Sequence, residues 1–99
     1  MTTLMTPEMV AKTLVEIEIS IGREITLCRR IIGQLKKAIH SRERQHGMTT
    51  ESLLLVVEQD QPAERNPDFR KWREDYQALQ SWQHRLSEYE QALQMLKGI

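Results

Sequence analysis

The fold of this chain is decided by residues 69–96, which read FRKWREDYQALQSWQHRLSEYEQALQML. Apolar and aromatic side chains recur there at steps of three or four residues, which is the spacing of one face of an α-helix. They are Phe69, Trp72, Tyr76, Leu79, Trp82, Leu86, Tyr89, Leu93 and Leu96. Asn66-Pro67-Asp68 before them supplies a capping side chain, a proline at the first helical position and an acid in the first turn. We therefore predict a helix over about residues 67–97, ended by Gly98.

A longer helix is predicted upstream, over about residues 7–46. Thr6-Pro7-Glu8 repeats the start signal, and Gly47 is a natural stop. Apolar residues recur between them at Val10, Leu14, Ile17, Ile21, Ile25, Cys28, Ile32, Leu35 and Ile39. At 1.5 Å per residue this helix is on the order of 60 Å long. Val15 and Ile19 add one apolar flank, and Leu27, Ile31 and Ala38 add another, so we expect more than one neighbouring helix.

The segment between the two helices contains five consecutive apolar residues, Leu53 to Val57. Periodicity cannot distinguish a short buried helix from a short strand in such a run. The capping residues Thr49–Ser52 and the lack of a second strand to pair with favour a short helix over about residues 50–58. Because an exposed apolar run promotes aggregation, we expect it to be buried within the fold or to form an interface through Leu53, Leu54 and Val57.

These elements predict an all-α fold, a long two-helix antiparallel hairpin with a short helical connector. The 99 residues suit a single helical domain over residues 1–99. A lone hairpin would leave the apolar flanks of the first helix in water. We therefore predict a homo-oligomer, preferably a dimer in which two hairpins form a helical bundle with coiled-coil-like packing.

Basic side chains gather on the second half of the first helix. Arg23, Arg30, Lys37 and Arg44 are spaced seven residues apart and form a row, with Arg29 and Lys36 beside it. We name Arg23, Arg29, Arg30, Lys36, Lys37 and Arg44 the basic strip. It is a candidate binding site for an anionic surface or an acidic partner. The alternatives are a solvated helix face, or a strip neutralised by the acidic residues Glu51, Glu58, Asp60 and Glu64 of the connector.

Two glycines, Gly22 and Gly33, lie inside the first helix, where each costs about 1 kcal/mol relative to alanine. They are three turns apart and share a face. They are candidates for close contact with another helix, since a missing Cβ is useful where a backbone comes near, and the alternative is glycine without a role.

The sequence offers no credible active site. Cys28 falls on the apolar stripe and is expected to be a small buried residue, and the aromatic residues of the last helix are expected to be core residues. We expect no cofactor, no metal site and no enzymatic activity. Because no long apolar stretch and no leader-like segment are visible, we expect a cytoplasmic protein without membrane association.

Two functions remain for a helical chain of this kind. We favour a non-enzymatic protein–protein interaction module, such as a small adaptor, inhibitor or assembly subunit that acts through helix faces. The alternative is a nucleic-acid-associated regulator that uses the basic strip. The formal net charge is zero and no DNA-binding motif is visible, so nucleic acid is the weaker option.

Overall fold

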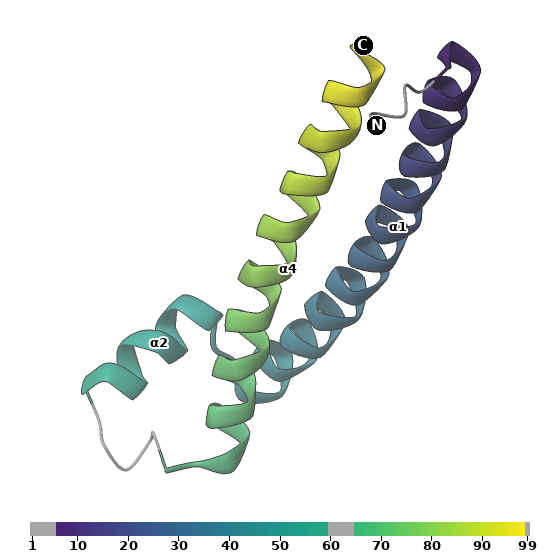
Figure 1. Ribbon diagram of the computed structural model, residues 1–99. Helices are drawn as coiled ribbons and strands as arrows, with labels where there is room; N and C mark the ends of the chain where they lie inside the picture. Colours follow the sequence, from purple (N-terminus) through teal and green to yellow (C-terminus); the bar gives the residue numbers. More distant parts are fainter. Residues whose placement is uncertain (1–5, 60–64, 99) are drawn as a thin grey trace.

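The computed structural model describes residues 6–59 and 65–98, and it confirms the all-α hairpin (Figure 1). Helix α1 spans Pro7–His46, α2 spans Thr50–Gln59 and α4 spans Pro67–Lys97. The long helices α1 and α4 run side by side in opposite directions, and the short helix α2 packs against α4. The described residues contain no strand.

The helix ends follow the signals in the sequence. The Thr6 hydroxyl accepts a hydrogen bond from the Met9 amide at 3.1 Å, and the Asn66 side chain accepts from the amides of Asp68 and Phe69. These contacts satisfy amides that have no partner inside the helix. Gly47 ends α1 at φ 59°, the left-handed conformation that glycine adopts without steric cost.

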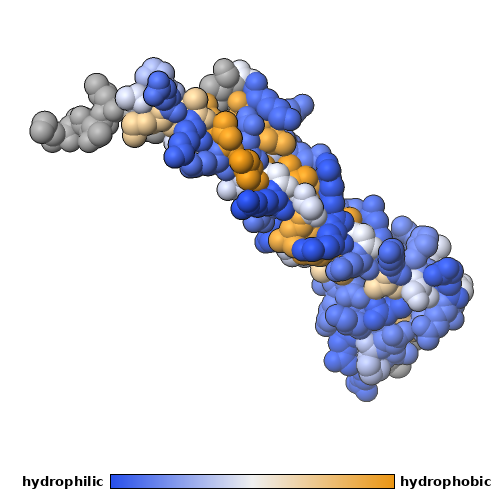
Figure 2. All heavy atoms as spheres, turned by 90° about the vertical axis from the view of Figure 1, so that its right-hand side faces the viewer, coloured by the Kyte–Doolittle hydropathy of each residue, from blue (hydrophilic) through white to orange (hydrophobic). Residues whose placement is uncertain are grey.

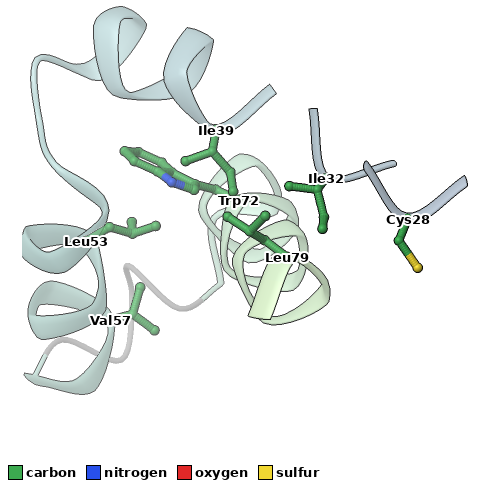
Figure 3. Packing of buried hydrophobic residues seen from close by; sticks show 7 residues of the cluster. All are labelled: Cys28, Ile32, Ile39, Leu53, Val57, Trp72 and Leu79. Atoms are coloured by element: carbon green, nitrogen blue, oxygen red, sulfur yellow. The ribbon is translucent and has the colours of Figure 1, made fainter. Parts of the chain in front are cut away.

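The apolar run Leu53–Val57 is helical, as predicted. The Thr49 hydroxyl caps α2 by accepting from the Ser52 amide at 3.2 Å. Leu53 and Val57 are one helical turn apart and are both buried, with exposed fractions of 0% and 7%. They point from α2 toward Trp72 and Leu79 of α4 (Figure 3). Their burial within their own chain makes α2 part of the core.

The core is confined to the closed end of the hairpin, where α1 turns back. We call this end the elbow. It is built by the second half of α1, by α2 and by the first part of α4, and its buried apolar residues are Cys28, Ile32, Ile39, Leu53, Val57, Trp72 and Leu79. Among the described residues, no apolar side chain before Ile25 in α1 or after Leu79 in α4 is buried. We call these two outer segments, residues 7–24 and 80–97, the open arms.

The molecule is correspondingly elongated. Its extents are 65 × 27 × 20 Å, and its radius of gyration is 20.5 Å. A compact domain of about 100 residues has a radius of gyration of about 13 Å. A chain this extended buries much less of its apolar surface than a compact domain of the same length.

Candidate interaction surfaces

A polar network joins α1 to α4 at the elbow. The Arg42 guanidinium donates to Asp75 at 2.6 Å and to Asp68 at 3.4 Å. Asp75 is only 8% exposed, and Lys71 approaches its second carboxylate oxygen at 3.2 Å. A buried carboxylate is tolerated when it is paired in this way, whereas loss of one partner leaves a costly buried charge.

A second set of hydrogen bonds brings in α2. The indole Nε1 of Trp72 donates to the Thr50 hydroxyl at 3.0 Å, and both the amide and the hydroxyl of Thr50 donate to the Glu43 carboxylate. The hydrogen bond from the Thr50 amide lowers the pKa of Glu43 below its ordinary value, because it stabilises the charged form. One threonine thus connects all three helices.

His46 completes the elbow. Its ring stacks on Trp72 and meets the Phe69 ring edge-on, and its Nε2 lies 2.5 Å from an Asp68 oxygen. The hydrogen bond with His46 lowers the pKa of Asp68, with a further contribution from Arg42. Within the described ranges, no buried side-chain polar atom lacks a partner and no group of His, Cys, Asp and Glu is arranged to hold a metal. The hydrogen bonds and ion pairs of the elbow thus join α1 to both α2 and α4.

Sequence reasoning missed this network, although a signal was present. The apolar stripe of α1 continues from Ile39 to Arg42 and His46 at steps of three and four. In α4, Asp75 falls between the core residues Trp72 and Leu79. Charged residues of opposite sign on two facing stripes indicate a buried pair.

The basic strip is exposed along its whole length. Of its six residues, only Arg29 forms an ion pair within the described part of the chain, with Glu90 of α4 at 3.8 Å. At about 100° per residue, the row from Arg23 to Arg44 lies on the side of α1 opposite Cys28 and Ile32. Arg23 and Arg30 therefore face away from α4, whereas Lys37 and Arg44 also line a groove that α4 helps to form. Of the acidic connector residues, Asp60 and Glu64 lie outside the described residues.

The strip borders a groove at the elbow. Its walls come from α1, α2 and α4, and its volume is about 640 Å³. We name it the basic groove. Its lining includes the apolar residues Ile39, Tyr76 and Leu79 together with four basic side chains. These are Lys36, Lys37, His40 and Arg44, with Glu43, Thr50 and Glu51 completing the lining. Such a groove suits an apolar segment that also carries carboxylates.

The open arms expose apolar side chains in the opposite half of the molecule. In α1 these are Met9, Val10, Val15, Ile17 and Ile19, each between 40% and 54% exposed. In α4, Met95 is 73% exposed, while Trp82, Leu86, Tyr89, Leu93 and Leu96 are half-buried. Figure 2 shows apolar surface gathered over the upper part of the hairpin, whereas hydrophilic surface dominates the lower part.

The remaining candidate residues differ in their surroundings. A Cβ atom added to Gly22 or Gly33 would meet no described neighbour within 4 Å, so the hairpin itself makes no close contact at either glycine. Leu53 and Val57 are covered by their own chain and Leu54 is half-buried, and the exposed apolar residues of α2 are instead Leu55 and Val56.

Cys28 and Trp72 are fully buried, as predicted for core residues. The other aromatic residues of α4 that were predicted to be core, Tyr76, Trp82 and Tyr89, are only half-buried beside it. The guanidinium of Arg85 lies 4.5 Å from the centre of the Trp82 ring. This part of α4 therefore keeps aromatic surface accessible.

Comparison with protein-family models, curated proteins and solved structures finds no match to this chain. None of the helices, over the residues that the structure describes, has a long enough apolar stretch to cross a bilayer.

Proposed function

We propose that this protein is a non-enzymatic interaction module whose open arms bind another polypeptide chain, a second copy of itself in the first instance. The observation that carries the proposal is the early end of the core. Buried apolar residues stop at Ile25 in α1 and at Leu79 in α4, yet the apolar stripes continue to the tips of both helices. The arms thus carry a core pattern with half of its packing partners missing.

The free energy gained by burying apolar surface supports this proposal. Burying apolar surface stabilises by about 25 cal/mol per Å², and a hairpin of two helices can cover only one side of each stripe. Val15 and Ile19 remain about half exposed on α1, and Leu93 and Leu96 remain half-buried on α4. A second pair of helices would cover these side chains, as in a four-helix bundle.

A substitution in the arms tests the proposal. Ile19 is 51% exposed, so replacing it with Glu costs the isolated hairpin little. In an interface the same change places a charge in apolar surroundings and weakens association strongly. We expect the Ile19→Glu variant to elute as a monomer in size-exclusion chromatography with light scattering, while the natural chain elutes as a dimer.

The neighbouring substitution Ser20→Glu is the matched control, because residue 20 is exposed and points away from Ile19. It should leave the mass unchanged. A natural chain that is monomeric at all concentrations, with the stability of its Ile19→Glu variant equal to its own, would contradict the proposal.

Nucleic-acid binding is a second candidate function, favoured by the exposure of all six residues of the basic strip. A row of exposed cations can contact a phosphate backbone. This candidate function predicts binding that weakens steeply between about 50 and 200 mM salt and is lost in the Arg30→Glu/Lys37→Glu variant. Fluorescence anisotropy with a labelled DNA duplex measures the salt dependence and the effect of the variant. Circular dichroism checks that the variant is folded.

A further inference from the structure

Charge is divided unequally along α1. The first part of the helix, up to Gly22, carries Glu8, Glu16 and Glu18 against Lys12. The remainder carries Glu24 and Glu43 against seven cations, Arg23, Arg29, Arg30, Lys36, Lys37, Arg42 and Arg44. Helix α1 therefore carries an acidic, partly apolar segment at one end and helps to line the basic groove at the other. We call the acidic segment, residues 7–22, the acidic arm.

The two ends also share a face. At about 100° per residue, Glu8, Val15, Glu18 and Ile19 fall within one arc of about 100° on α1. Gly33, Lys36, Lys37, His40 and Arg44 fall within the same arc, and four of these five line the basic groove. The acidic arm and the basic groove thus point in the same direction, about 40 Å apart at 1.5 Å per residue. Within one chain they cannot meet.

We infer that the occupant of the basic groove is the acidic arm of α1 from a second copy of this chain, bound antiparallel. This inference rests on the proposed function and specifies its geometry. In an antiparallel pair, the arm of each copy lies along the groove of the other, so both contacts form at once around one two-fold axis. A parallel pair would instead place acid against acid and base against base, which is unfavourable.

The apolar surfaces of the arm and the groove also fit this pairing. The groove has apolar surface from Ile39, Tyr76 and Leu79, and the arm offers the exposed side chains of Val15 and Ile19. A two-fold axis perpendicular to α1 also places α4 and its counterpart on the same side. The four long helices then form one antiparallel bundle.

Charge and helix geometry together favour one register. With the axis midway between residues 27 and 28, Glu18 lies level with Lys37 of the other copy. Gly22 then faces Gly33, where the structure leaves space beside both backbones. Glu8 comes within one turn of Arg44.

Exchange of charge between arm and groove tests the contact. The arm variant is Glu8→Lys/Glu18→Lys, and the groove variant is Lys37→Glu/Arg44→Glu. Each alone creates like-charge contacts at both grooves, so we expect the dimer dissociation constant to rise about tenfold or more. The fourfold variant that combines both changes restores opposite charges and should return the dissociation constant to within about threefold of the natural value. Sedimentation equilibrium measures all three.

The control for the arm variant is Glu58→Lys/Glu74→Lys, which changes the net charge equally on exposed positions of α2 and α4 that lie outside the open arms and the basic groove. It should leave association unchanged. Because Glu8 also stabilises the first turn of α1, the single Glu18→Lys variant, which lies well inside the helix, is measured beside the arm variant, and its dissociation constant should rise as well.

Disulfide trapping tests the direction independently of charge. In the antiparallel pair, cysteines at positions 18 and 37 lie opposite each other in different copies, whereas two copies of position 18 are about 28 Å apart. We expect the double variant Glu18→Cys/Lys37→Cys to form a covalent dimer on mild oxidation, and each single variant to form none. Cys28 is fully buried and stays unreactive.

The outcomes separate this inference from the proposed function. Restoration by the fourfold variant together with trapping only in the double variant supports the antiparallel contact. A dimer that is indifferent to these charges, or that is trapped by a single cysteine, overturns the contact and leaves the interaction module standing. A chain that stays monomeric overturns both.

Discussion

At the scale of single residues, the elbow depends on a few polar side chains at positions where the helical periodicity predicts apolar ones. Arg42 and His46 continue the apolar stripe of α1, and Asp75 interrupts that of α4. The two stripes face each other, so the charges meet as a pair in which Asp75 is buried and Arg42 is half-buried. The sequence shows the basic residues of α1 and the acid of α4 separately. Each resembles an ordinary polar position until the register of the two helices is known.

Removing the carboxylate of Asp75 should destabilise the hairpin. The Asp75→Asn variant keeps the volume but loses the charge that pairs with Arg42 at 2.6 Å and with Lys71. We expect the free energy of unfolding to fall by about 1.5–3 kcal/mol, the typical contribution of a hydrogen bond to a charged group. Urea unfolding followed by circular dichroism measures the loss. The adjacent exposed Glu74→Gln should change stability by less than about 0.5 kcal/mol, and equal effects at both positions would contradict a buried pair.

The stability of the elbow should also fall in acid. The folded-state pKa values of Asp68 and Glu43 are lowered from their ordinary values of 3.8 and 4.5 by hydrogen bonds, chiefly from His46 and from the Thr50 amide. A lowered folded pKa means that the contribution is fully present above the ordinary value and is lost as the pH falls through the folded value. We expect the unfolding midpoint in urea to decline below about pH 4.5. The Asp68→Asn variant should decline less steeply, and parallel curves would rule out Asp68 as a source.

At the scale of elements, the helices could be predicted in detail because their determinants are local. Pro7 and Pro67, the caps Thr6 and Asn66, and the stop at Gly47 act over three or four residues, and all are found in their expected roles. The position of α2 could not be predicted. Its docking depends on Thr50 meeting both Trp72 and Glu43, which are distant in sequence.

Burial of α2 predicts unequal effects of two leucines. Leu53 is fully buried, whereas Leu55 in the same helix is 57% exposed. We expect Leu53→Ala to lower the free energy of unfolding by about 2–5 kcal/mol and Leu55→Ala to lower it by less than about 0.5 kcal/mol. Thermal unfolding of the two variants makes the comparison. Equal effects would show that α2 is not held against α4.

Replacing Gly33 should have opposite effects on the stability of the α1 helix and on dimer association. Replacing it with Ala should favour the α1 helix by up to about 1 kcal/mol, because no described neighbour lies within 4 Å of the new Cβ. If another helix approaches closely there, the same change should weaken association. We therefore expect a variant with a higher helix content as a monomer but a larger dimer dissociation constant. A variant that gains stability and associates as before would show that the glycine has no contact role.

At the scale of the whole molecule, the elongated shape follows from where the core lies. The elbow holds α1, α2 and α4 together, but the arms extend beyond it and give a radius of gyration of 20.5 Å. The sequence predicted the helices and the excess of apolar flanks. It could not show that the buried core would be confined to one end, since that depends on how α2 and the polar network fill the elbow. The basic groove was hidden for the same reason, as its apolar surface comes from residues on two helices.

The most direct test of the central claim is the mass of the chain in solution. Sedimentation equilibrium between about 1 and 100 µM should give twice the 11.7 kDa of the chain, with dissociation only toward the dilute end. The thermal midpoint of unfolding should rise with protein concentration over the same range, because association stabilises the folded state. A mass of one chain at every concentration, with a constant midpoint, would contradict the claim that the open arms bind another copy.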